Sequence, residues 1–281
     1  MIWTRVADAY RWRKTLSSCR LSIEELEFPL DQPGENDFII AGCPRTGTSL
    51  LAATLFQPPD LVVSMEPWDG LRMPPAELFT SLRSEIRDTG ALRRGRLDVS
   101  AIRSEGRVGW HRDGEKTHAI SLHQPFQLGV KWPTFWQYLD LLDRTRFLIT
   151  LRHPADVVTS FGQVGGRLSQ GFDYDVPFNA RMNASVAAAS NDSIERRALL
   201  YEYINSRIEP HLSRPNVLAV RYERWTDDPT ELISEIAAFL GVPHISPKVA
   251  IHPHIGRAYP DDLTRLIRRW CPSASKLGYD I

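Results

Sequence analysis

The chain has 281 residues, of which 42% are hydrophobic and 24% are charged, a composition typical of a soluble globular protein with a full core. Its 34 basic and 34 acidic side chains cancel, so its overall charge does not favour nucleic acid or an anionic membrane as a partner. Any site for an anion must therefore be local. The three cysteines form no CxxC pair, which fits a reducing compartment without a cysteine metal cluster.

The N-terminal stretch MIWTRVADAYRWRKTLSSCR contains no apolar run long enough for a signal peptide or a membrane span. We therefore expect a cytoplasmic protein. We interpret residues 1–36 as a solvated N-terminal arm and residues 37–281 as one domain.

Short apolar runs alternate with amphipathic stretches from residue 37 onward. Strands are predicted at residues 37–42, 61–64, 128–132, 146–151 and 216–222. Helices are predicted at residues 48–57, 134–143 and 155–163, and after Pro229. Strands separated by helices indicate a parallel sheet with helices on both faces. The fold class predicted is therefore α/β, with a single P-loop-type domain.

The last of these helices carries the clearest boundary signals in the chain. Asp228 is a candidate N-cap, Pro229 occupies the first helical position, and Gly241 follows the apolar stretch ELISEIAAFL. These residues predict a helix that ends at residue 240.

Ligands of a parallel sheet bind at the carboxyl ends of its strands. This rule places the following residues along one edge of the sheet: 42–49, Glu66, Lys131, Arg152 and Tyr222. The polar, glycine-containing segments near 88–127 and 164–195 look irregular. We interpret them as insertions that cover this edge and select the acceptor.

The stretch GCPRTGTS, residues 42–49, fits the phosphate-binding pattern G-x-x-x-x-G-K-S/T except that Thr48 stands in place of the lysine. Backbone N–H groups of such a loop bind phosphate or sulfate, and Arg45 adds a fixed positive charge. The carboxylate that holds Mg²⁺ in nucleoside triphosphatases is not recognisable after an apolar strand. The loop therefore predicts an anion site that requires no metal.

A second cluster, TLRHPADVVTSF, spans residues 150–161. Arg152 closes a predicted strand, and Ser160 lies two turns into the following helix. Together they predict a clasp for a second, separate phosphate.

These motifs resemble the sulfotransferases that use 3′-phosphoadenosine 5′-phosphosulfate (PAPS). CPRTGTSLL is similar to their 5′-phosphosulfate loop, and RHPADVVTS to their 3′-phosphate motif. VRYERWTDDP and the closing LGY at 277–279 also have counterparts there. The arginine in the loop and the Glu66-Pro67 pair look most like the carbohydrate and tyrosylprotein branch.

The resemblance implies PAPS as the donor and a hydroxyl acceptor on a carbohydrate, a glycosylated small molecule or a lipid. It implies that Glu66 is the general base and that Arg45 and Lys131 stabilise developing charge. The implied cofactor contacts are Arg45, Thr46, Gly47, Thr48, Ser49, Arg152, Ser160, Tyr222, Gly256 and Arg257.

Several alternatives stay open at this point. Glu66 could cap a turn or pair with Arg72, and a histidine could replace it as base. The candidate histidines are His111, His118 and His123. His252 and His254 lack further ligands at metal-binding spacing, so no metal site is expected. A P-loop kinase or nucleoside triphosphatase, and an inactive nucleotide-binding protein, are the rival functions.

Overall fold

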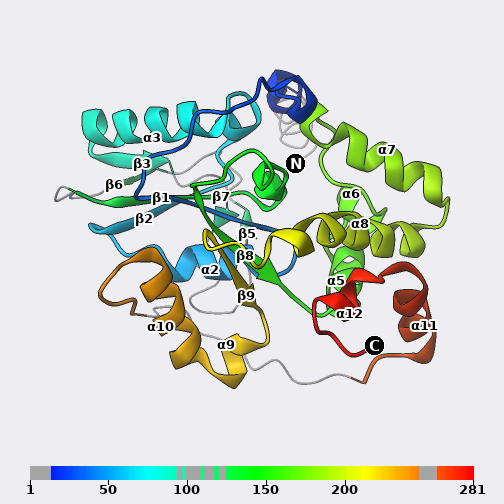
Figure 1. Ribbon diagram of the computed structural model, residues 1–281. Coiled ribbons are helices and arrows are strands. Elements are labelled where there is room, and N and C mark those ends of the chain that lie inside the picture. The colour runs from blue at the N-terminus through cyan, green and yellow to red at the C-terminus, as the bar shows by residue number, and fades with distance from the viewer. Residues whose placement is uncertain (1–13, 94–96, 99–108, 111–116, 120–124, 247–257) are drawn as a thin grey trace, which may run out of the picture.

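The computed structural model describes residues 14–93, 97–98, 109–110, 117–119, 125–246 and 258–281 (Figure 1). Five parallel strands form the central sheet, in the spatial order β2-β7-β1-β8-β9. Their bounds are β1 Asp37–Gly42, β2 Leu61–Met65, β7 Gln127–Lys131, β8 Arg146–Leu151 and β9 Val217–Arg221. The predicted parallel α/β architecture is confirmed.

The central strands are buried along nearly their whole length. Every residue of β1 and β2 is buried, as expected for a parallel sheet that is covered on both faces. In the register of the sheet, Lys131 at the end of β7 pairs with Met65 of β2 and with Ile40 of β1. This register brings the residue after β2, Glu66, next to Lys131.

Helices lie on both sides of the sheet, with α3 on one side and α10 on the other in Figure 1. The longer helices are α2 Thr48–Thr54, α3 Pro75–Thr89, α5 Pro154–Val164, α7 Ala180–Ala189, α8 Ser193–Ile208, α10 Pro229–Leu240 and α11 Asp261–Trp270. Single turns form α6 Gly166–Ser169, α9 Arg224–Asp227 and α12 Ser273–Lys276. The 3₁₀ helices are η1 Ile23–Glu25, η2 Trp68–Leu71, η3 Pro133–Tyr138, η4 Pro177–Asn179 and η5 Glu209–His211.

The helix predicted at 134–143 is wrong. The chain there forms the short 3₁₀ helix η3. Phe135, Trp136 and Tyr138 are all buried, so aromatic side chains project into the core on several sides of this segment. Phe135, Tyr138, Leu139 and Leu142 have the spacing of one helical stripe, which explains the prediction, but Trp136 on another side is buried as well.

The segment 164–195 is also different from its prediction, because it is largely helical rather than irregular. It contains α6, η4, α7 and the start of α8. Gly165, with a φ of 71°, separates α5 from α6, and Gly166, with a φ of 62°, is the first residue of α6. Asp192 caps α8 by accepting hydrogen bonds from the N–H groups of Ile194 and Glu195 at 2.8 and 3.0 Å.

In the other predicted insertion, 88–127, the described residues form two short antiparallel pairs. One pair is β3 Ala91–Arg93 with β6 Thr117–Ala119, and the other is β4 Leu97–Asp98 with β5 Gly109–Trp110. That either insertion selects the acceptor stays a prediction.

The described part of the N-terminal arm contacts the domain through its apolar side chains, while many of its other residues are exposed. Cys19 is buried, and the Leu21 N–H donates to the Leu71 carbonyl at 3.2 Å. Apolar side chains of this segment, Leu16 among them, contact the core. Burial of these apolar side chains favours the contact between the segment and the domain.

The boundaries of α10 are predicted correctly, but its cap is not. Pro229 is the first residue, and Gly241 ends the helix with a φ of 70°. Asp228 occupies the N-cap position, and its carbonyl accepts from the Leu232 N–H at 3.0 Å, but its side chain makes no bond to the helix N–H groups. Its carboxylate instead accepts from Arg224 Nε at 3.0 Å, since this ion pair offers a charged donor.

Candidate functional site

The loop between β1 and α2 has a backbone shape that depends on glycine. Gly47 has a φ of 104°, and a Cβ atom placed on it would lie 2.7 Å from Tyr222 Cδ2. Arg45 also lies in the left-handed region, with a φ of 75°. Within the described residues, the hydroxyls of Thr48 and Ser49 have no hydrogen-bond partner, so both are free to bind a ligand.

Thr46 has a different role from its neighbours in the loop. Its side chain is buried, donates to the Cys43 carbonyl at 2.6 Å and contacts Thr150 Oγ1 at 2.6 Å. The hydroxyl predicted to contact the cofactor therefore ties the loop to β8. Its backbone N–H donates to the Cys43 carbonyl as well.

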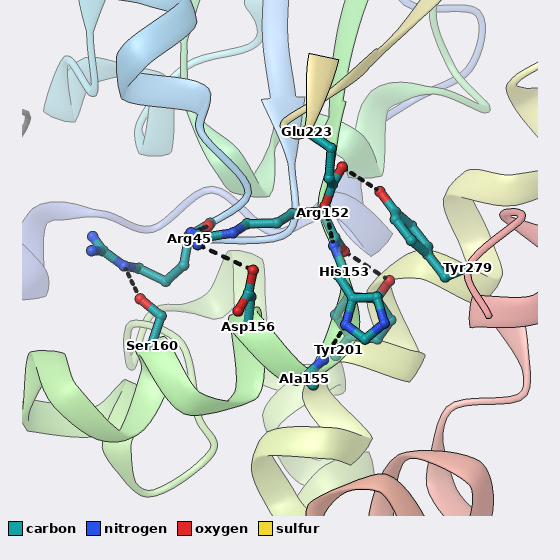
Figure 2. Close-up of polar contacts among 9 residues, drawn as sticks. All are labelled: Arg45, Arg152, His153, Ala155, Asp156, Ser160, Tyr201, Glu223 and Tyr279. Atoms are coloured by element: carbon teal, nitrogen blue, oxygen red, sulfur yellow. Dashed lines mark hydrogen bonds and ion pairs between the residues drawn. The ribbon is translucent and has the colours of Figure 1, made fainter. Parts of the chain in front are cut away.

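The loop and the second predicted cluster form one site. Figure 2 shows Arg45 extending toward Ser160 on α5, and Arg45 Nε donates to Ser160 Oγ at 3.0 Å. Arg152 Nη1 donates to the Arg45 carbonyl at 3.3 Å, and its Nη2 lies 3.4 Å from Asp156. Arg152 and Ser160 are therefore both linked to Arg45, and their clasp for a second phosphate stays a prediction.

Two guanidinium groups next to each other give this region a concentrated positive charge. Burial, and then the charge of Arg152, lower the pKa of Arg45. The guanidinium of Arg152 lies 4.2 Å from the ring centroid of Tyr222. Its Nε is buried and, within the described residues, has no hydrogen-bond partner. A bound anion would supply the missing acceptor and compensate both cations.

A network of hydrogen bonds behind Arg152 holds the start of α5 (Figure 2). The His153 N–H donates to Glu223 Oε1 at 2.9 Å, and Tyr279 Oη donates to Glu223 Oε2 at 3.4 Å. Tyr201 Oη donates to the Arg152 carbonyl at 3.3 Å. Glu223 and Tyr201 were not identified from the sequence. The position of Glu223 directly after Tyr222 at a strand end was the available signal for it.

Glu66 and Lys131 form a buried ion pair at the ends of β2 and β7. Lys131 Nζ donates to Glu66 Oε1, and the exposed fractions of the two side chains are 2% and 12%. Burial lowers the pKa of Lys131, while the Glu66 carboxylate opposes this shift. The Glu66 N–H donates to the Lys131 carbonyl at 2.7 Å, and Glu66 has a φ of 51°.

The geometry of Glu66 resolves one alternative raised by the sequence. Arg72 pairs with Asp69 at 2.8 Å rather than with Glu66. Within the described residues, Glu66 Oε2 has no hydrogen-bond partner. Lys131 therefore orients the carboxylate and leaves one oxygen available to accept a proton.

Aromatic residues that follow Glu66 and Lys131 in the chain pack against one another. Trp68 contacts Trp132 edge-on with ring centroids 5.4 Å apart, and contacts Tyr174 with centroids 5.6 Å apart. Trp68 and Trp132 follow Glu66 and Lys131 closely in the chain. Both tryptophan side chains are buried.

Some of the sequence predictions lie outside the described residues. These are Gly256, Arg257, His111, His123, His252 and His254. His118 belongs to β6, where it pairs with Leu92 of β3. Among the described residues, no three His, Cys, Asp or Glu side chains are grouped to hold a metal ion. A search of the same residues finds no helix with the length and apolar character needed to cross a membrane.

Comparison with models of protein families shows the family to which the chain belongs. The model described as "Sulfotransferase family" matches residues 37–246, from the first residue of β1 to beyond α10. The chain belongs to the sulfotransferase family. The matched range includes the loop, the Glu66–Lys131 pair and the Arg152 cluster, so the described part of the site lies within the family's own domain. No curated protein matches the chain.

Solved structures of other sulfotransferases resemble this one at low sequence identity. The sulfotransferase domain of the curacin biosynthetic pathway is 17% identical, with a TM-score of 0.43 over 90% of this chain and 100% of that one. A sulfotransferase from Alicyclobacillus acidocaldarius is 15% identical, with a TM-score of 0.47 over 90% of this chain and 98% of that one. The mouse sulfotransferase SULT7A1 complexed with PAP is 13% identical, with a TM-score of 0.39 over 95% of this chain and 72% of that one.

Proposed function

We propose that this sulfotransferase transfers the sulfuryl group of PAPS to a hydroxyl of a carbohydrate or another small molecule, without a metal ion. The proposal rests on one observation: the site has a positively charged end and an end that holds a carboxylate. Arg45, Arg152 and Ser160 gather beside the glycine-containing loop, and the Glu66–Lys131 pair lies at neighbouring strand ends.

The residues present fit a nucleotide with two separated anionic groups. The loop hydroxyls of Thr48 and Ser49 and the guanidinium of Arg45 would hold the 5′-phosphosulfate. Arg152 and Ser160 would hold the 3′-phosphate, and the buried Arg152 Nε lacks an acceptor among the described residues. Tyr222, whose ring lies against the guanidinium of Arg152, would also contact the nucleotide.

Bound PAPS supplies an electrophilic sulfuryl group attached to a stable leaving phosphate. Glu66 Oε2 would accept the proton of the acceptor hydroxyl as that oxygen becomes a nucleophile. Lys131 holds Glu66 in place and, together with Arg45, would stabilise the negative charge that develops on the transferred and departing oxygens. Fixed donors of this kind contribute about 3 to 4 kcal/mol each in other enzymes.

The acceptor class is inferred from local sequence. An arginine in the loop together with Glu66-Pro67 is similar to the carbohydrate and tyrosylprotein branch of the family. A hydroxyl acceptor needs a general base, and Glu66 has one free carboxylate oxygen among the described residues. A panel of saccharides, phenols and long-chain alcohols with radiolabelled PAPS would identify the acceptor.

The donor is tested by calorimetric titration and thermal shift with adenosine 3′,5′-bisphosphate and with ATP, each with and without Mg²⁺. We expect the bisphosphate to bind and to raise the melting temperature equally with and without the metal. A nucleoside triphosphatase or kinase would instead bind ATP in a Mg²⁺-dependent manner. Binding of the bisphosphate without turnover of any acceptor would support an inactive nucleotide-binding protein.

A further inference from the structure

Two side chains hold one peptide group at the nucleotide end of the site. This group joins Arg152 to His153, and Figure 2 shows Tyr201 and Glu223 in contact with it. Its carbonyl accepts a hydrogen bond from Tyr201 Oη at 3.3 Å. Its N–H donates to Glu223 Oε1 at 2.9 Å. Because the carbonyl and the N–H of a trans peptide point in opposite directions, the two side chains fix the peptide plane from opposite sides.

The peptide group before Arg152 is held as well. Its carbonyl, which belongs to Leu151, accepts from the Tyr222 N–H at 2.8 Å. Tyr222 directly precedes Glu223, so one short segment after β9 contacts both peptide groups. The orientations of the two peptide groups beside an α-carbon define its φ and ψ, and with them the direction in which the side chain leaves the backbone. Contacts of the backbone therefore set the direction of the Arg152 side chain.

The two side chains that hold the peptide group are themselves fixed. Tyr201 lies on α8 and is buried. Glu223 also accepts from Tyr279 Oη at 3.4 Å. The guanidinium of Arg221 lies 4.9 Å from the ring centroid of Tyr279 and also donates to the Leu277 carbonyl. Three segments far apart in the chain, α8, the end of β9 and residues 277–279, thus converge on this peptide group.

The guanidinium of Arg152 has only part of its donors engaged. Nη1 donates to the Arg45 carbonyl and Nη2 contacts Asp156, whereas the buried Nε has no hydrogen-bond partner within the described residues. A planar guanidinium binds a phosphate through paired N–H groups only when its plane faces the phosphate oxygens. Fixing the backbone beneath it reduces the freedom that the side chain would lose on binding a ligand.

We propose that Tyr201 and Glu223 are positioning residues, which aim Arg152 at the 3′-phosphate of the nucleotide by fixing the peptide group that follows it. Tyr279 keeps Glu223 in place. These residues act through Arg152 and need no contact of their own with the nucleotide. The inference rests on the proposed function, because it takes Arg152 to bind the 3′-phosphate. Selectivity for a 3′-phosphorylated nucleotide then depends on side chains that lie behind the site.

The first test is Tyr201→Phe, which removes only the hydroxyl that bonds to the peptide carbonyl. We expect affinity for adenosine 3′,5′-bisphosphate to fall about three- to tenfold, the range for one neutral hydrogen bond, and affinity for AMP to change less than about twofold. Calorimetric titration with both nucleotides measures the two affinities. Tyr203→Phe, the same change two positions away on α8, is the matched control and should behave as the wild type.

Glu223 is tested with a pair of variants. Glu223→Ala removes the acceptor of the His153 N–H and should weaken bisphosphate binding about tenfold or more, whereas Glu223→Gln keeps an acceptor oxygen and should restore most of the affinity. A merely structural role would lower the melting temperature and leave the ratio of the two nucleotide affinities as in the wild type. An unchanged ratio in both Tyr201→Phe and Glu223→Ala would overturn the inference.

A second measurement uses the unmodified protein. In hydrogen exchange followed by NMR, the His153 amide should exchange much more slowly than in the unfolded chain even without nucleotide, because its bond to Glu223 is already formed. An unprotected amide would overturn the inference and leave the proposed function intact. If the wild type bound AMP as tightly as the bisphosphate, the proposed 3′-phosphate site would be wrong, and the inference with it.

Discussion

The two ends of the proposed site differ in how their charged side chains are compensated. At the transfer end, Lys131 is 2% exposed and is already neutralised by Glu66. At the nucleotide end, the Arg152 side chain is 20% exposed, and its contact with Asp156 is 3.4 Å long. Arg45, beside it, bonds to a neutral serine. One end is balanced in charge and largely shielded from solvent, and the other holds excess positive charge.

This difference follows from what each end is proposed to do. A catalytic carboxylate in a low-dielectric setting has to be oriented and compensated, or it costs several kcal/mol to bury. A site for an anion gains most if its cations are left without a strong internal partner, because the ligand then supplies it. The following predictions test whether the two ends behave as separately as their contacts indicate.

The largest effect is expected at the balanced end. Lys131→Met leaves Glu66 buried without its partner, so the free energy of unfolding should fall by about 3 to 5 kcal/mol. Urea denaturation measures this change. The double variant with Glu66→Gln should recover most of the loss, since it removes the uncompensated charge. Arg144→Met, at an exposed position, is the control. A loss of less than about 1 kcal/mol would mean that the pair behaves as a surface ion pair.

The next effect concerns catalysis alone. Glu66→Gln keeps the shape of the side chain but removes the proposed base, so turnover should fall at least about a hundredfold. Affinity for adenosine 3′,5′-bisphosphate should change little, because Glu66 is not at the nucleotide end. Glu77→Gln on the exposed surface of α3 is a matched control. Turnover like that of the wild type would remove Glu66 from the role of base.

At the positively charged end the expected effect is on affinity. Arg152→Ala removes a charged donor, which should weaken binding of adenosine 3′,5′-bisphosphate by about 1.5 to 3 kcal/mol. Binding of AMP, which lacks the 3′-phosphate, should weaken far less, and calorimetry of both nucleotides measures the difference. If both nucleotides lose the same affinity, Arg152 does not bind the 3′-phosphate.

The smallest effect is a gain in stability. Because the folded-state pKa of Asp173, about 6, lies above its ordinary 3.8, the folded protein binds more protons than the unfolded chain between these values. Stability contributed by this group therefore falls as the pH rises through that window. Asp173→Asn should raise the free energy of unfolding by about 1 to 3 kcal/mol at pH 7.5 and by much less at pH 4.

Denaturation curves at the two pH values measure this difference, with Asp175→Asn as the exposed control. A change of the same size at both pH values would indicate altered packing rather than removal of a buried charge.

Local sequence was sufficient to predict the main elements of the fold. Apolar runs bounded by turn residues predicted the five strands of the central sheet, and Pro229 and Gly241 predicted α10. These signals depend on neighbours in the chain. They failed at η3, because its aromatic residues pack on several sides of the chain, and at 164–195, because glycines there separate helices instead of forming a loop.

The sequence by itself determined which chemical groups are present: a lysine-free phosphate loop, an arginine and a serine two turns apart, and a strand-end glutamate followed by proline. Only the tertiary structure decided how they combine. Parallel strand order and register place Glu66 against Lys131, and packing of α5 beside the loop brings Ser160 to Arg45. Such pairings join positions far apart in the chain, so no local pattern encodes them and they form only when the sheet assembles.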